Sequence, residues 1–161
     1  MRNQARCLPR QVGCLFLALV GGCGSPDGNV SHLTVPGPDL TQVSDRRLIA
    51  AIKVAQSDVR GQPSAPAWVR LGHIYLIHGW PDEAAGCYQS AVDAGPDQFR
   101  WHYFHGRALS ETNLPAAARA FAAAIQLDSE YLPAYVHGAR VLRDMGRVDA
   151  AVGYLGRALA Q

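Results

Sequence analysis

The sequence has no apolar run long enough to form a permanent transmembrane helix. Its N-terminal apolar run, Val12–Val20, is interrupted by Gly13 and Cys14 and is roughly ten residues long, about half of what a spanning helix needs. The sequence also lacks a phosphate-binding loop, a His-Glu-x-x-His pair and a nucleophile in a recognisable elbow. We therefore expect neither a permanent membrane-spanning helix nor an enzyme.

The sequence also lacks a complete set of metal ligands. Its four cysteines do not have zinc-binding spacing. His102 and His105 are three residues apart on an expected helix, but no carboxylate or third histidine lies at a supporting spacing. The sequence therefore predicts no metal site and no cofactor.

Positive charge is concentrated at the N-terminus. Arg2, Arg6 and Arg10 precede every acidic residue, and the formal net charge of the whole chain is only +2. The rest of the chain therefore has no basic excess, so we do not expect nucleic-acid binding. A chain with 48% hydrophobic and 17% charged residues is expected to fold.

The N-terminal arginines and the apolar run that follows them have the order of a secretion signal, which we place at residues 1–22. The next segment, Val20-Gly21-Gly22-Cys23, resembles the lipobox of bacterial lipoproteins. The resemblance implies that the thiol of Cys23 receives a diacylglycerol and that Cys23 becomes the first residue of the mature chain. Cys14 is a weaker candidate because Gln11 occupies its −3 position. The alternative is an ordinary cleaved signal in which Cys23 merely lies nearby.

The lipobox resemblance also predicts a location. The chain would be secreted across the inner membrane and held by acyl chains, with no spanning helix. Gly24, not aspartate, follows Cys23, and in Gram-negative lipoproteins this feature is typical of the outer membrane, facing the periplasm. After processing, Cys87 is the only unmodified thiol; beside Tyr88 on an expected helix, it is predicted to be a packing residue.

Residues 23–43 are predicted to be a lipidated cysteine followed by a flexible tether. Pro26, Gly28, Pro36, Gly37 and Pro38 interrupt any helical period in this segment. A lipid anchor needs a spacer that lets a folded domain stand clear of the headgroups. We therefore expect the segment to be extended and mobile.

An internal repeat organises the rest of the chain. Eight residues match, in order and spacing, the pattern W-x2-L-G-x2-Y, A-x3-F, A, P. They are Trp68, Leu71, Gly72, Tyr75, Ala84, Tyr88, Ala91 and Pro96. The pattern then recurs at steps of 33 and 34 residues. The corresponding residues are Trp68, Trp101 and Tyr135; Ala84, Ala117 and Ala151; Tyr88, Phe121 and Leu155; and Ala91, Ala124 and Ala158.

This pattern resembles the tetratricopeptide repeat (TPR) family over residues 65–161. The resemblance implies an all-α fold, an α-α superhelix of about three helix-turn-helix repeats at residues 65–97, 98–131 and 132–161. Large side chains of one helix would fill the gaps left by alanine and glycine on its partner. In the middle repeat, either His105 or Gly106 could occupy the small-residue position.

Helix boundaries can be placed from turn residues. Gly79 and Gly146 fall where a first helix should end in a left-handed residue, and we expect Asn113 to take this role in the middle repeat. Pro96 and Asp128-Ser129 should stop second helices, and Pro133 should open the third pair. Upstream, residues 44–60 have helical apolar spacing, with Ser44 as the expected N-cap. This N-terminal capping helix could equally be a degenerate half-repeat.

Members of the TPR family bind extended or helical peptides in a concave groove lined by the first helix of each pair. Carried over by position, the groove would contain eight residues. They are Val69, His73, Leu76, His102, Tyr103, Val136, Arg140 and Arg143. An apolar end and an arginine end would suit a peptide with hydrophobic residues near an acidic one. The lysine and asparagine pattern of carboxylate-clamping members is not reproduced, because Lys53 is the only lysine. The alternative is an ordinary solvated helix face.

The last repeat has an apolar stripe with no later helix in the chain to cover it. The stripe consists of Val148, Val152, Leu155 and Leu159. It is predicted to be a surface for a partner or for homo-oligomerisation; the alternative is a modest exposed patch of no consequence. Together, these features predict a membrane-anchored adaptor of the bacterial cell envelope that binds proteins or peptides. The alternative function is a structural accessory subunit of a permanent envelope assembly, such as pilus, secretion or outer-membrane machinery.

Overall fold

The computed structural model describes residues 34–160. The predicted signal peptide, Cys14 and the lipidation residue Cys23 lie outside the described residues. The predictions made for these three features therefore stay predictions.

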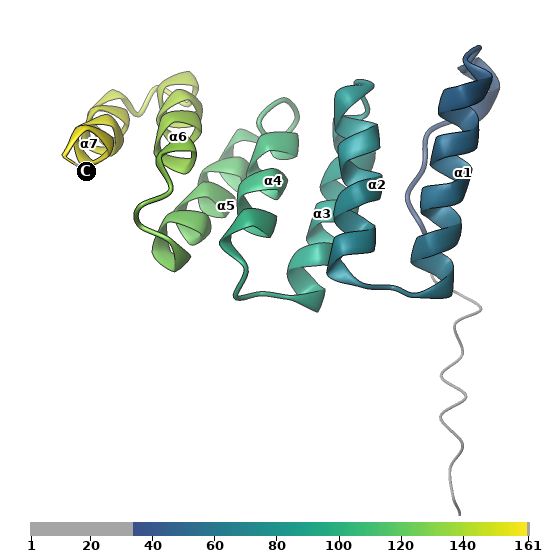
Figure 1. Cartoon of the computed structure of the whole chain (residues 1–161). Helices are drawn as coiled ribbons and strands as arrows, with labels where there is room; N and C mark the ends of the chain where they lie inside the picture. The colour runs from purple at the N-terminus through teal and green to yellow at the C-terminus, as the bar shows by residue number, and fades with distance from the viewer. Residues whose placement is uncertain (1–33, 161) are drawn as a thin grey trace, which may run out of the picture.

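Residues 34–160 form a row of seven α-helices and contain no strand (Figure 1). A short 3-10 helix, η2 (Leu40–Gln42), precedes them. The helices are α1 (Arg46–Gly61), α2 (Ala65–Ile77), α3 (Pro81–Ala94), α4 (Phe99–Leu109), α5 (Leu114–Leu127), α6 (Leu132–Asp144) and α7 (Val148–Leu159). The predicted all-α fold, with three helix pairs after an N-terminal helix, is confirmed. None of the described helices is both long and apolar enough to span a membrane.

In each helix pair, a glycine on the first helix leaves room for a large aromatic ring from the second. A Cβ atom on Gly72 of α2 would lie 2.9 Å from Tyr88 of α3, and one on Gly106 of α4 would lie 3.0 Å from Phe121 of α5. A Cβ at the first distance would force the ring to move, and a Cβ at the second would be a tight contact. The missing Cβ therefore lets the paired helices approach closely. The pairs are α2 with α3, α4 with α5, and α6 with α7.

The contacts show which residues are the small residue and the large ring in the middle and third pairs. In the middle pair the small residue is Gly106, not His105. In the third pair Gly138 faces Tyr154, with 3.0 Å between its Cβ position and the ring. The repeat spacing assigned the large residue of this pair to Leu155, but Leu155 is exposed. The repeat geometry therefore shifts by one residue at the C-terminal end of the array.

The turns agree with the predicted chemistry, with two exceptions. Gly79 and Gly146 have φ values of +79° and +75°, in the left-handed region that glycine adopts without strain. Asn113 does not: its φ is −148°, and its side chain caps α5 by accepting a hydrogen bond from the Ala116 amide. The N-cap of α1 is Asp45, not Ser44; its carboxylate accepts hydrogen bonds from two amides of the first turn.

Residues 34–43, which we name the N-terminal strap, pack on the repeats. The prediction of a mobile tether is therefore wrong for this part of the segment. The hydroxyl of Tyr75 donates to the Pro36 carbonyl (2.9 Å) and accepts from Gln56 Nε2 (2.9 Å). Val35 and Leu40 contact the core formed by α1, α2 and α3. A Cβ atom on Gly86 would lie 3.0 Å from the Pro36 ring, so the strap lies directly against α3.

Two fully buried tyrosines allow the contribution of the strap to be measured. Tyr75→Phe removes a hydroxyl that bonds both the strap and α1, so we expect the free energy of unfolding to fall by about 1 kcal/mol. Tyr88→Phe is the matched control, because the Tyr88 hydroxyl is buried and has no hydrogen-bond partner among the described residues. Urea unfolding followed by circular dichroism measures both. An equal loss in the two variants would contradict a stabilising strap.

Candidate protein-binding grooves

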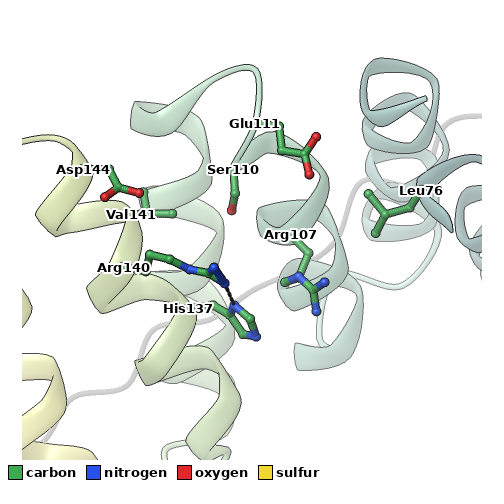
Figure 2. A pocket seen from close by; sticks show the side chains of 8 residues that line it. All are labelled: Leu76, Arg107, Ser110, Glu111, His137, Arg140, Val141 and Asp144. Carbon is green, nitrogen blue, oxygen red and sulfur yellow. Dashed lines mark hydrogen bonds between the residues drawn. The ribbon is translucent and has the colours of Figure 1, made fainter. Parts of the chain in front are cut away.

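The first helices of the three pairs line a hollow of about 260 Å³, which we name the central groove. Leu76 comes from α2, Arg107 from α4 and His137 from α6, so the groove spans all three repeats. Figure 2 shows Arg107 across the hollow from His137 and Arg140. The lining residues are Leu76, Arg107, Ser110, Glu111, His137, Arg140, Val141 and Asp144.

The charges of the central groove are unevenly paired. Asp144 accepts two hydrogen bonds from the neighbouring Arg143, at 2.7 and 2.9 Å, so its charge is already compensated. Arg107 and Arg140 form no ion pair with any described residue. Both guanidinium groups are therefore available to a carboxylate, which arginine binds through two parallel hydrogen bonds.

His137 lies between these two arginines, and its Nδ1 atom is 3.5 Å from Nη2 of Arg140 (Figure 2). Burial lowers the pKa of His137 below its ordinary value of 6.5, and the positive charges of Arg107 and Arg140 lower it further. The imidazole is held in place by two rings, since it stacks on Phe121 and lies 5.8 Å from Tyr103. It is therefore a neutral ring at pH 7, in a position where a negative ligand would favour its protonation.

Packing of the aromatic residues positions Arg107. Its Nη1 atom is 3.4 Å from the Tyr103 hydroxyl, to which it donates. Tyr103 is itself buried against Phe104, Phe121 and Tyr131. The guanidinium thus projects from a rigid base into the groove, so little side-chain entropy is lost on binding.

The structure divides the eight residues predicted for the groove among several places. Leu76 and Arg140 line the central groove, whereas Val69 and Tyr103 are buried between helices. His73 packs edge-on against Phe104, with ring centroids 4.5 Å apart. The other three residues lie elsewhere. His102 lies in a hollow between α3, α4 and α5, while Val136 and Arg143 line a different groove at the C-terminal end.

Sequence reasoning missed most of the central groove because of its register. Arg107 lies one turn beyond the positions predicted on α4, and His137 is next to the predicted Val136. The sequence left open whether His105 or Gly106 is the small residue of α4, and this choice sets which α4 side chains face the groove. Contact of Gly106 with Phe121 turns Arg107 and Ser110 towards α6, and the spacing of residues alone could not decide this rotation.

The C-terminal end has a second, apolar hollow of about 390 Å³ between α6 and α7, which we name the terminal groove. Its lining residues are Val136, Ala139, Arg140, Arg143, Val148, Ala151, Val152 and Leu155. The four residues of the predicted apolar stripe are all exposed, and Leu159 extends it beyond the groove. Arg140 borders both grooves.

The other candidate chemical groups do not form sites. No cluster of three metal-ligating side chains occurs in residues 34–160. His102 Nε2 lies 2.7 Å from the Pro96 carbonyl, so this ring ties the start of α4 to the preceding loop. Cys87 is fully buried, and burial raises the pKa of its thiol to about 12. It is therefore an unreactive packing residue, as the sequence predicted.

Comparison with known proteins identifies the fold. No protein-family model and no curated protein match the sequence. Among solved structures, MamA is 23% identical and superposes with a TM-score of 0.67 over 70% of this chain and 67% of that one. YrrB, described as a TPR protein with an unusual peptide-binding site, is 19% identical, with a TM-score of 0.66 over 71% of this chain and 60% of that one.

A third similar structure contains a bound peptide. The second TPR of Spaghetti (RPAP3), bound to the HSP90 peptide SRMEEVD, is 18% identical, with a TM-score of 0.57 over 69% of this chain and 97% of that chain. The present chain thus spans about two thirds of the MamA chain, 60% of the YrrB chain and nearly all of this single domain. The three pairs of antiparallel helices, each closed on a glycine, therefore form a TPR-type α-solenoid.

Proposed function

We propose that the protein is a lipid-anchored binding module of the bacterial cell envelope that takes an acidic peptide in its central groove. The observation that carries the proposal is the pair Arg107 and Arg140, two arginines without ion-pair partners among the described residues that face one hollow from neighbouring repeats. The chain has no catalytic role in this function. Its specificity comes from charge and from the shape of the stacked first helices.

The groove favours a peptide of defined chemistry. Two arginines and a neutral histidine favour carboxylates, while Leu76 and Val141 provide apolar contact at the same hollow. Glu111 also lines it, and this carboxylate would repel a second negative charge at that end. A peptide with one or two acidic residues beside a hydrophobic one fits this arrangement best.

Similar folds support a peptide ligand. The RPAP3 domain binds a peptide that contains two glutamates and a C-terminal aspartate, and YrrB has a peptide-binding site. This chain has a single lysine, Lys53 on α1, so arginines must supply the positive charge of its groove. Arginine binds carboxylates in fixed, bidentate geometry, which makes the contact more directional than a lysine contact.

The envelope location rests on the N-terminal sequence. Arg2, Arg6 and Arg10, the apolar run after them and the segment Val20-Gly21-Gly22-Cys23 together support secretion and lipidation at Cys23. Gly24 supports the outer membrane if the organism is Gram-negative. Acyl chains at Cys23 would keep the repeats at the membrane surface without a spanning helix.

The alternative function is a structural accessory subunit of one permanent envelope assembly. The exposed apolar stripe on α7 favours it, because permanent interfaces are more apolar than transient ones. Crosslinking in intact cells distinguishes the two functions. An adaptor gives several partners in sub-stoichiometric amounts, whereas a subunit gives one partner at a fixed ratio.

Removing the two arginines tests the central groove. We expect Arg107→Ala with Arg140→Ala to weaken binding of an acidic, hydrophobic peptide by at least about tenfold, because each carboxylate loses a charge-assisted hydrogen bond. Arg46→Ala, on the exposed start of α1, is the matched control and should change nothing. Fluorescence anisotropy with Glu-containing peptides and their Gln counterparts measures the affinity. Equal binding of the two peptide sets would contradict the proposal.

The histidine gives the binding a pH dependence. The pKa of His137 is lowered in the free protein, and a bound carboxylate would raise it. The complex would therefore take up a proton, and affinity should increase as pH falls from neutrality through the pKa in the complex. The increase levels off once the pH falls below the lowered pKa of His137 in the free protein. Affinity then declines where peptide carboxylates protonate, near their ordinary pKa of about 4.3. His137→Gln should flatten the profile above that pH; an unchanged profile in this variant would assign the effect to another group.

Lipidation can be tested without knowing any partner. In a bacterial host, we expect intact-mass measurement of the full chain to show cleavage before Cys23 and the added mass of acyl chains. Cys23→Ser should abolish the modification and release the protein from the membrane fraction. Cys14→Ser is the matched control and should remain lipidated. A membrane-bound Cys23→Ser variant would contradict this assignment.

A further inference from the structure

The last helix pair exposes a face that the earlier pairs cover. By sequence spacing Leu155 matches Tyr88 and Phe121, which are 0% exposed. In the structure Tyr154 takes their place against the glycine of the partner helix, and Leu155 is left 43% exposed. Ala85, which corresponds to Val152, is 8% exposed, whereas Val152 is 62% exposed. This difference arises because α4 and α6 cover the first two pairs, whereas no helix of the described chain comes after α7.

The covering helices place a flat ring on the large residue of the preceding pair. Phe104 of α4 stacks on Tyr88, with centroids 5.7 Å apart and planes at 22°. His137 of α6 stacks on Phe121 at 6.2 Å and 17°. Phe104 and His137 are one repeat apart in the sequence, so this contact is a regular feature of the array. In the third pair the ring that enters the glycine is Tyr154, which does not line the terminal groove. The terminal groove is therefore a place for one more helix, as α4 and α6 are on the earlier pairs, without an equivalent ring contact.

The charge of the terminal groove limits what that helix can be. Arg140 and Arg143 line one side of an otherwise apolar hollow, and Arg140 has no acidic partner among the described residues. A second copy of the chain related by a two-fold axis would present the same surface. Because no acidic residue lines the groove, a second copy would offer Arg140 no carboxylate from that surface, whereas an acidic helix would.

We propose that the terminal groove binds an amphipathic helix of another protein. That helix carries two apolar residues three or four positions apart, facing Leu155 and Val152. Acidic residues along its flank meet Arg140, beside which lies Arg143, already paired with Asp144. The site is separate from the central groove and does not depend on a peptide binding there, although Arg140 borders both.

A synthetic peptide based on α6 (Leu132–Asp144) provides a direct probe, because α6 already covers the equivalent face of α5. In the acidic probe, three exposed positions of α6 are changed: Val136→Glu, Arg140→Glu and Arg143→Glu. The basic probe has lysine at the same three positions. We expect the acidic probe to bind the full chain at least about tenfold more tightly than the basic one, measured by fluorescence anisotropy.

Variants of the full chain locate the binding. Val152→Glu with Leu155→Glu should weaken the acidic probe by at least about tenfold, as loss of a central apolar contact does. Val54→Glu is the matched control, since Val54 is 61% exposed on α1 at the other end of the array. Circular dichroism checks that each variant keeps its helix content. In an Arg107→Ala background, Val152→Glu with Leu155→Glu should still weaken the acidic probe, which separates this site from the central groove.

Three results would overturn the proposal. The first is equal affinity for the acidic and basic probes, which would remove the role of the arginines. The second is an equal loss of binding in Val54→Glu, which would place the probe elsewhere. The third is a stable dimer in sedimentation experiments that Leu155→Glu dissociates, because a second copy would then occupy the groove.

Discussion

The close approach of paired helices at single glycines is the constraint on which the rest of the structure depends. Gly72, Gly106 and Gly138 each admit a ring at a distance that would crowd a Cβ atom. This contact fixes the rotation of each first helix about its own axis, and hence the side chains that it turns towards the neighbouring repeat. The central groove is a consequence of this packing, because Arg107 lies next to the glycine that contacts Phe121.

The same side chains serve both packing and surface chemistry. Phe121 fills the space over Gly106 and stacks on His137, and Tyr103 supports both His137 and Arg107. The groove thus has a rigid aromatic base with charged tips. Rigid placement lowers the entropy cost of binding and makes the arginine geometry specific. A substitution in this base would disturb binding and stability together, whereas changes at the tips separate the two.

Much of the architecture could be predicted from the sequence because small and large residues recur at a fixed step. Trp68, Trp101 and Tyr135 give the helix pairs, and Gly79 and Gly146 give two of the turns. The register within a repeat could not be predicted where the pattern weakens. His105 and Gly106 were indistinguishable by spacing, and Leu155 matched a column whose place Tyr154 takes. The docking of the strap was not predicted, because prolines and glycines interrupt a helical period both in a packed segment and in a mobile one. The sequence pattern therefore did not distinguish the two.

Docking of the strap would shorten the reach of the proposed lipid anchor at Cys23. With the segment fixed from residue 34 onward by Pro36 and Tyr75, only about ten residues separate Cys23 from the folded part, a contour of at most roughly 35 Å. A protein tethered at Cys23 would sample a thin layer above the bilayer, not the full depth of an envelope compartment. Partners embedded in or lying on that bilayer would then meet it at high local concentration, while distant ones would have to come to the surface.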